Sequence, residues 1–201
     1  MSSALIAIAG PSGSGKTTLA QGIVEALGRE EAGLIALDAY YRDLRFLPPD
    51  ERARQNFDHP DALEWPLIRQ HMGALARGER IALPHYDFAS HTRTERTECV
   101  EAKPYILVEG LFALHDPEMR QLCTKRIFVT NTHDVCLERR AGRDIRERGR
   151  TPESVQAQYD ATVRPMADAY IFPSAAHAEL TLVCAGQTSL LVRQALDYIR
   201  S

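Results

Sequence analysis

The sequence predicts an α/β fold of three layers, in which helices cover both faces of a parallel β-sheet of about five strands. Short, continuous apolar runs alternate along the chain with segments whose apolar residues recur at helical spacing. Strands that are apolar along their whole length are typical of parallel sheets buried on both faces. The strand–helix–strand order is typical of the crossover connections that parallel sheets require.

The elements can be assigned in order along the chain. The predicted strands are the apolar runs at residues 4–9, 33–37, 105–108, 126–129 and 180–183. The predicted helices cover about residues 17–27, 62–76, 117–122, 133–147, 153–171 and 188–200. Thr151 and Pro152 are typical of a helix start, with Thr as the cap and Pro in the first turn.

Residues 39–97 interrupt this alternation. Residues 39–60 are rich in Tyr, Arg, Asp and Pro and show little periodicity. Residues 80–97 predict a short strand or hairpin around residues 81–83, followed by a polar loop. We interpret residues 39–97 as a substrate-side excursion from one domain that spans residues 1–201.

Composition excludes several classes of protein. The 201 residues carry a formal net charge of −3, whereas nucleic-acid binders usually show a basic excess, so no nucleic-acid partner is expected. No apolar run approaches the roughly 20 residues of a membrane span, and the first residues do not resemble a secretion signal. We therefore expect a cytoplasmic protein with no membrane partner. The spacing of its cysteines predicts neither a zinc site nor a disulfide framework; they are Cys99, Cys123, Cys136 and Cys184.

A phosphate-binding loop follows the first predicted strand and precedes the first predicted helix. Residues 10–17 match the pattern GxxxxGK[ST] in full. Glycines allow the backbone to turn tightly so that successive N–H groups point at phosphate oxygens, and the helix N-terminus adds its positive dipole end. Lys16 can reach the β- and γ-phosphates, and the Thr17 hydroxyl can bind Mg²⁺. The predicted nucleotide-binding residues are Gly10, Pro11, Ser12, Gly13, Ser14, Gly15, Lys16, Thr17 and Thr18.

The phosphate loop predicts a P-loop NTPase fold but not the phosphate acceptor, because GTPases, ATPases and kinases all use it. Ligands of such sheets lie beyond the carboxyl ends of the strands, so the residues after each strand decide the chemistry. Five further segments are informative: residues 37–41 (LDAYY), 56–62 (NFDHPDA), 84–93 (PHYDFASHTR), 108–110 (VEG) and the arginine-rich run 139–150. Together with the phosphate loop, they resemble the uridine-cytidine kinase family over about residues 5–183.

The resemblance assigns two acidic residues to the reaction centre. Asp38, after the second strand, would be the catalytic base that accepts the proton of a sugar 5′-hydroxyl, and it would lie near the metal. Glu109 ends a strand where a carboxylate can bind Mg²⁺ directly or through water. The predicted metal ligands are therefore Thr17, Asp38 and Glu109. The alternatives are an exposed turn aspartate and a solvated or helix-capping glutamate.

The resemblance also implies a pyrimidine nucleoside as acceptor. Asp58 would accept hydrogen bonds from the ribose hydroxyls. Tyr86 and His91 would contact the base, and Phe88 would supply an aromatic face. A histidine can donate or accept a hydrogen bond, which suits both uracil and cytosine, so both uridine and cytidine are expected. Taken alone, His91 would be a surface-loop histidine.

The run 139–150 contains six arginines in twelve residues. A solvated helix face is the usual reading of a charge run. Because this run follows a strand and belongs to a P-loop fold, we instead interpret residues 139–152 as a lid that closes over ATP, with Gly142 and Gly149 easing its motion. The resemblance places Arg143 and Arg148 on the ATP phosphates, as catalytic residues beside Asp38 and Lys16. It places Arg140, Arg150 and Gln158 on the nucleoside side.

The C-terminal region departs from the family pattern. The lysine expected after Pro173 and the Pro-Arg-Gly segment expected near Gly186 are both missing, and Gln187 is a weak candidate for contact with ATP. We expect an ATP-dependent, Mg²⁺-dependent nucleoside kinase, with GTP as an alternative donor, that forms a homo-oligomer (a tetramer by resemblance). Two alternatives stay open. One is a kinase of the same fold that acts on another acceptor, as phosphoribulokinase, pantothenate kinase and nicotinamide riboside kinase do. The other is a nucleotide-binding regulatory protein without catalysis.

Overall fold

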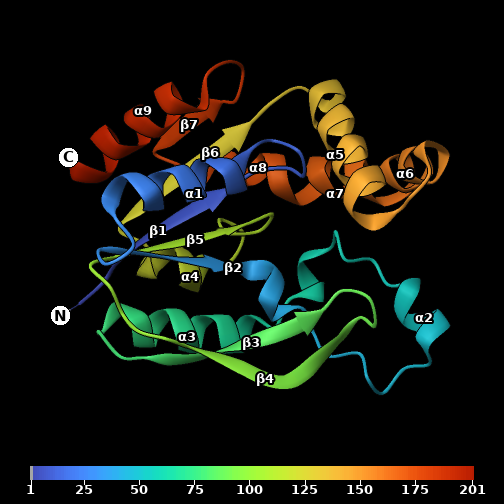
Figure 1. Cartoon of the computed structure of the whole chain (residues 1–201), viewed down its shortest axis with the longest axis horizontal. Helices are drawn as coiled ribbons and strands as arrows, with labels where there is room; N and C mark the ends of the chain where they lie inside the picture. The colour runs from blue at the N-terminus through green and yellow to red at the C-terminus, as the bar shows by residue number, and fades with distance from the viewer. Residues whose placement is uncertain (1) are drawn as a thin grey trace.

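The structure, a computed structural model, describes residues 2–201 apart from the side chains of residues 147 and 148 (Figure 1). Its main sheet has five strands in the order β2-β5-β1-β6-β7, and every neighbouring pair is parallel. The strands are β1 (Ala4–Ala9), β2 (Ala32–Ala36), β5 (Tyr105–Gly110), β6 (Lys125–Thr130) and β7 (Leu180–Val183). The predicted parallel sheet of about five strands is therefore confirmed.

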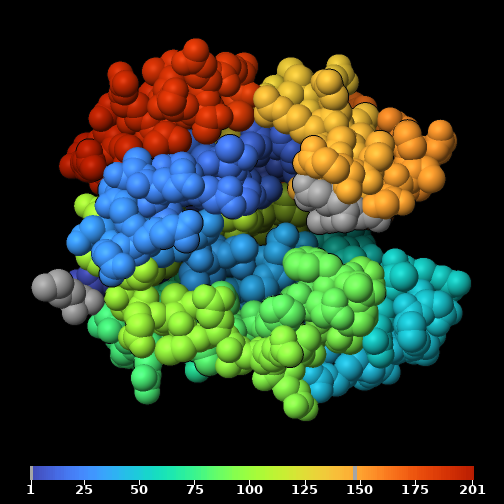
Figure 2. Space-filling view, viewed as in Figure 1, coloured from blue at the N-terminus to red at the C-terminus, as the bar shows by residue number. Residues whose placement is uncertain are grey.

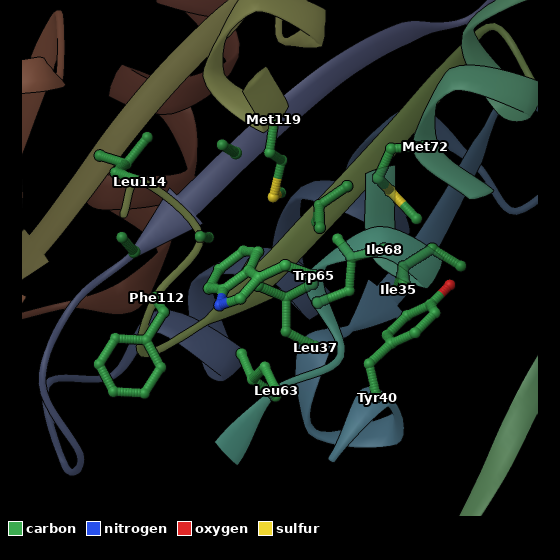
Figure 3. Close-up of a cluster of buried hydrophobic side chains, with 14 of the residues drawn as sticks. Ile35, Leu37, Tyr40, Leu63, Trp65, Ile68, Met72, Phe112, Leu114 and Met119 are labelled. Carbon is green, nitrogen blue, oxygen red and sulfur yellow. The ribbon is translucent and has the colours of Figure 1, made fainter. Parts of the chain in front are cut away.

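Side chains of the central strand alternate between two apolar clusters, as the two-residue period of a strand requires. Ile6 and Ile8 belong to the cluster that includes helices α1 (Lys16–Leu27) and α9 (Thr188–Arg200). Leu5 and Ala7 belong to a second cluster, on the opposite face, that includes α3 (Trp65–Ala76) and α4 (Pro117–Leu122). Figure 3 shows part of this second cluster, with Trp65, Met72 and Met119 packed together. The sheet is thus covered on both faces, which gives three layers.

A second sheet forms in the region predicted as an excursion. Strands β3 (Ile81–Asp87) and β4 (Thr92–Val100) pair antiparallel as a hairpin. The polar loop predicted up to residue 97 is wrong for residues 92–97, which belong to β4. The middle of β4 is exposed, so its side chains are polar, and the strand is specified by backbone pairing with β3 rather than by an apolar pattern.

The rest of the excursion holds short elements. A 3₁₀ turn, η1 (Leu37–Tyr40), follows β2 directly, and α2 (Pro49–Ala53) lies further along the chain. A second 3₁₀ turn, η2 (Pro60–Ala62), precedes α3, so the helix predicted from residue 62 begins at residue 65. Pro60 and Pro66 lie at the N-terminal ends of these two elements, where the missing N–H of proline costs nothing.

The C-terminal half contains the arginine-rich helix α5 (His133–Arg148) and a long helical run from residue 152 to residue 174. In this run, α6 (Pro152–Gln158), α7 (Arg164–Met166) and α8 (Phe172–Ser174) alternate with π-helical segments η3 (Tyr159–Val163) and η4 (Ala167–Ile171). A 3₁₀ turn, η5 (Ala175–His177), follows. Pro165 follows the first π segment and Pro173 the second, and a widened turn relieves the clash between a proline ring and the preceding turn. Within residues 2–201, no helix is both long and apolar enough to cross a membrane.

Candidate active site

A cavity of about 650 Å³ lies at the carboxyl ends of the strands. On the face shown in Figure 2, the surface is hollowed between the C-terminal helices and the β3–β4 hairpin. Residues from the phosphate loop, the excursion, β5, α5 and the 152–174 run all line this cavity. The lining residues are Ser12, Lys16, Thr17, Asp38, Tyr41, Ala53, Phe57, Asp58, Tyr86, Phe88, Ala89, His91, Glu109, Leu111, Arg140, Arg143, Arg150 and Gln158.

The phosphate loop connects β1 to α1. Gly13 and Gly15 have φ angles of 82° and 97°, in the left-handed region that favours glycine. A Cβ atom on Gly13 would lie 2.2 Å from the carbonyl oxygen of Cys136, so a larger residue does not fit there. Ser12, Lys16 and Thr17 line the cavity. The other predicted nucleotide-binding residues belong to the same loop and helix start but do not line the cavity; they are Gly10, Pro11, Gly13, Ser14, Gly15 and Thr18.

Oxygen atoms suited to a hard cation lie beside the phosphate loop. The Thr17 hydroxyl donates to Glu109 Oε1 at 3.2 Å, while Glu109 Oε2 is buried and has no hydrogen-bond partner in the described part of the chain. Burial raises the pKa of Glu109, the charge of Lys16 lowers it, and the charge of Asp38 raises it. A hydroxyl next to a buried carboxylate with a free lone pair fits Mg²⁺, which keeps water or phosphate oxygens as its remaining ligands.

The described residues contain no group of three or more His, Cys, Asp or Glu side chains that could hold a metal by themselves. A cation here would therefore depend on oxygens from a bound phosphate or from water. Asp38 lies in η1, directly after β2, and lines the same cavity as Lys16 and Glu109. The topology thus brings the predicted base and the predicted metal ligands to one end of the sheet.

A third acidic side chain, that of Asp58, also lines the cavity. Asp58 is buried, and its Oδ2 accepts a hydrogen bond from the Thr162 hydroxyl at 3.5 Å. Burial raises the pKa of Asp58, whereas the nearby guanidinium of Arg140 and the Thr162 hydrogen bond lower it. A buried carboxylate with few partners is suited to accept hydrogen bonds from ligand hydroxyls.

Aromatic rings surround the space next to Asp58. Tyr86 is buried, and its ring centroid lies 5.4 Å from that of Tyr41 and 5.3 Å from that of Phe88. His91 stacks on Phe57, with 4.6 Å between the ring centroids and 17° between the planes. Such a set of apolar faces suits a flat ring.

His91 combines an unusual backbone conformation with a lowered pKa. His91 has a φ angle of 54° and is the single non-glycine residue with positive φ among residues 2–201. Strained conformations of this kind concentrate at functional sites. Burial and the charge of Arg52 lower the pKa of His91, while the charge of Asp87 raises it. A lowered pKa favours the neutral imidazole, which can donate one hydrogen bond and accept another.

The arginine-rich helix reaches the phosphate loop. Arg140 donates to Ser12 Oγ at 3.0 Å and to Gln158 Oε1 at 3.1 Å, and Arg143 donates to Ser12 Oγ at 3.4 Å. Arg150 also donates to Gln158 Oε1. Arg140, Arg143 and Arg150 therefore present cationic groups on the side of the cavity opposite the hairpin. The side chain of Arg148, predicted on the ATP phosphates, lies outside the described residues.

Asp144 holds these arginines and was not identified from the sequence. Its carboxylate is fully buried and lies 3.1 Å from Arg143 Nε, 3.6 Å from Arg140 Nε and 3.8 Å from Arg150 Nη1. Because Arg140 and Arg143 turn their Nε edges to Asp144, their terminal nitrogens are directed to Ser12. In the sequence, Asp144 is one acidic residue within a charge run, and its burial follows no visible pattern.

Other cavity residues were also missed. Tyr41 and Phe57 stand inside the motifs that carried the family resemblance, and their aromatic character was the available signal. Leu111 directly follows β5, where ligand contacts are expected. Gln187, the weak candidate for ATP contact, precedes α9 and does not line the cavity. The missed lining residues are Tyr41, Ala53, Phe57, Ala89 and Leu111.

Comparisons with known proteins give a consistent result. The sequence model of the "Phosphoribulokinase / Uridine kinase family" matches residues 5–190. A uridine kinase from Vibrio cholerae is 41% identical over 94% of this chain and 90% of its own length. A uridine kinase from Chloroflexus aggregans is 43% identical over the same shares. Phosphoribulokinase from Rhodobacter spheroides has a similar fold, with a TM-score of 0.68 and 16% identity, covering 90% of this chain and 69% of that one.

Proposed function

Because the chain belongs to the Phosphoribulokinase / Uridine kinase family, we propose that it is a uridine/cytidine kinase. It transfers the γ-phosphate of ATP to the 5′-hydroxyl of a pyrimidine nucleoside and releases ADP with UMP or CMP. The observation that carries this proposal is one cavity in which a phosphate loop and a set of aromatic rings face each other. Asp38 lies in the same cavity, as a base between donor and acceptor requires.

At the donor end, Lys16 and the backbone of residues 10–17 bind the phosphates. Thr17 and Glu109 would hold Mg²⁺, with Asp38 nearby, and the cation would supply charge neutralisation on the phosphate oxygens. Arg143, together with Arg148, stabilises the negative charge on the transferred group. Residues 139–152 act as the lid that carries these side chains over ATP.

At the acceptor end, the 5′-hydroxyl oxygen forms a bond to the γ-phosphorus as the bond from that phosphorus to the ADP oxygen breaks. Asp38 accepts the hydroxyl proton. Most of the rate enhancement comes from holding the two substrates in line and from stabilising charge.

The nucleoside is held by residues on both sides of the cavity. Asp58 accepts hydrogen bonds from the ribose hydroxyls, and Arg140, Arg150 and Gln158 close the nucleoside site from the opposite side of the cavity. The base lies among the aromatic rings, where Tyr86 and His91 contact its polar edge and Phe88 its face. A neutral His91 can serve either uracil or cytosine, which supports activity on both nucleosides.

Two finer assignments complete the proposal. ATP is the donor, with GTP as an alternative, since the phosphate loop binds the triphosphate rather than the base. The protein assembles as a homo-oligomer, a tetramer by resemblance to its family. An acceptor without an aromatic ring, such as ribulose 5-phosphate, is disfavoured because it would offer no flat ring to the aromatic side chains that line the cavity.

ADP release measured with MgATP and a panel of acceptors tests the proposal. The panel contains uridine, cytidine, adenosine, nicotinamide riboside, pantothenate and ribulose 5-phosphate. We expect activity on uridine and cytidine, and we expect Asp38→Asn to lower kcat by about 10²- to 10⁴-fold, the usual contribution of a general base. Asp197→Asn, on the exposed surface of α9, is the matched control and retains activity. Activity on another acceptor alone would contradict the substrate, and nucleotide binding without any acceptor-dependent ADP release would indicate a regulatory protein.

A further inference from the structure

The 152–174 helical run contacts the acceptor side of the cavity through a residue that has no role in the reaction proposed above. Tyr170, in η4, contacts His59, the residue that follows Asp58. We propose that Tyr170 is a positioning residue for the acceptor, because its hydroxyl holds the loop of Asp58 against the helical run. This proposal rests on the proposed function and names a residue through which that site acts.

The hydrogen bond between these residues has a defined direction. His59 Nδ1 accepts from the backbone N–H of Asp61 at 3.1 Å, so the neutral ring carries its proton on Nε2. Nε2 therefore donates to the Tyr170 hydroxyl oxygen, 2.9 Å away. The two rings meet edge to face at 4.8 Å between centroids, and the Tyr170 ring also lies 5.9 Å from that of His115. The ring is thus packed independently of its hydroxyl, which adds the bond to His59.

The π-helical segments explain how one helical run reaches the loop twice. Thr162 contacts Asp58, and Tyr170 contacts the next residue. Eight residues of regular α-helix would turn these two side chains about 80° apart. A π turn holds one residue more, so the same eight residues span about two turns and the two side chains differ by roughly 20°. Both therefore lie on the face that meets the loop.

The 152–174 helical run also contacts the arginine-rich helix α5. His133, the first residue of α5, has its Nδ1 3.0 Å from the Tyr159 hydroxyl and its Nε2 3.1 Å from Asp168 Oδ1. The run thus lies between the loop of Asp58 and α5. Loss of the Tyr170 contact would loosen the loop of Asp58 at His59 and leave the attachment to α5 intact, so the effect should fall on the acceptor rather than on ATP.

Tyr170→Phe tests this role, because it removes the hydroxyl and retains the ring. We expect the KM for uridine to rise about 2- to 10-fold, the usual effect of losing one hydrogen bond. The KM for MgATP, kcat and the thermal midpoint should stay close to wild type. Tyr198→Phe is the matched control, since its hydroxyl bonds to Glu179 beside α9 and its loss should change neither KM.

His59→Asn supplies a second variant. Asn retains a side-chain oxygen for the N–H of Asp61 but cannot reach Tyr170. If the two side chains act as a unit, the double variant should raise the KM for uridine no more than the more severe single variant does. An unchanged KM for uridine in Tyr170→Phe would overturn the proposal, as would an equal rise in both KM values, which would indicate general loosening.

The acceptor that the wild-type enzyme uses distinguishes a failure of this proposal from a failure of the proposed function. Wild-type activity on a different acceptor would contradict the substrate assigned above, and the role of Tyr170 would then be read from the KM of that acceptor. An unchanged KM in the variant, with wild-type activity on uridine, would contradict the role of Tyr170 alone.

Discussion

A side chain that is placed to bind a ligand can lower the stability of the ligand-free protein, and Glu109 in this cavity is an example. Glu109 is buried, and burial raises its pKa because a charged carboxylate loses its hydration. Between the ordinary pKa and the raised one, the folded protein binds more protons than the unfolded chain. Stability therefore falls as pH rises through that window and stays lower above it. The charged form of Glu109 is thus useful for a cation and unfavourable without one.

Glu109→Gln should therefore stabilise the ligand-free protein at neutral pH while removing its Mg²⁺-dependent activity. The advantage should be present at pH 7 to 8 and should vanish as pH falls below the ordinary value of 4.5, where Glu is protonated in both states. Thermal midpoints of the wild type and the variant between pH 4 and pH 8 measure it. Glu25→Gln, on the exposed face of α1, is the control and should show no such trend. A variant that melts below the wild type at pH 7 would show that Glu109 is held by structural contacts instead.

At the scale of elements, the arginine-rich helix combines firm attachment with one weak position. Gly142 lies in the middle of α5 and is exposed, and apart from the helix's own backbone no described atom lies within 4 Å of the place where a Cβ would lie. Glycine lowers helix stability relative to alanine by about 0.5–1 kcal/mol. A weak point in this helix fits the proposal that residues 139–152 act as a lid, because a lid must bend as it closes.

Gly142→Ala should accordingly raise stability and slow the reaction. The thermal midpoint should rise by about 1–4 °C, since about 1 kcal/mol corresponds to roughly 2–4 °C for a chain of this size. If the bend is needed, kcat should fall severalfold. Gly149→Ala is the contrasting variant, because Gly149 has a φ angle of 62° and alanine there should lower the midpoint. A more stable Gly142→Ala enzyme with unchanged kcat would exclude bending at this position.

The elements also show what the sequence can and cannot predict. The buried strands and the phosphate loop were predictable because neighbouring residues determine each of them. Apolar runs indicate the strands, and the GxxxxGK[ST] spacing indicates the loop. Strand β4 was missed, because an exposed strand paired to one neighbour carries no apolar pattern. The π segments were missed too, since a proline predicts an interruption but not its form. Asp144 was missed because its carboxylate is buried by surrounding arginine side chains, and their positions follow from the folded structure rather than from the sequence pattern.

At the scale of the molecule, the cavity divides two groups of elements. The phosphate loop, α5 and the 152–174 run lie on one side, and the β3–β4 hairpin with the loop of Asp58 lies on the other (Figure 1). Direct contacts already cross between them, such as that from Thr162 to Asp58. Each substrate would touch both sides, because Arg140 and Gln158 line the same cavity as Asp58 and Lys16.

Donor and acceptor should therefore stabilise the protein more together than the sum of their separate effects. Either ligand at 100 times its Kd should contribute about 2.7 kcal/mol if the two bind independently. The first ligand orders the arginines and the helical run, so the second no longer carries that entropic cost. Thermal midpoints with a non-hydrolysable ATP analogue and Mg²⁺, with uridine, and with both ligands measure the coupling. An excess of about 1 kcal/mol corresponds to about fivefold tighter binding of each ligand in the presence of the other. A strictly additive result would mean that the two halves of the cavity bind their ligands as rigid, independent sites, and that closure contributes to the rate without contributing to affinity.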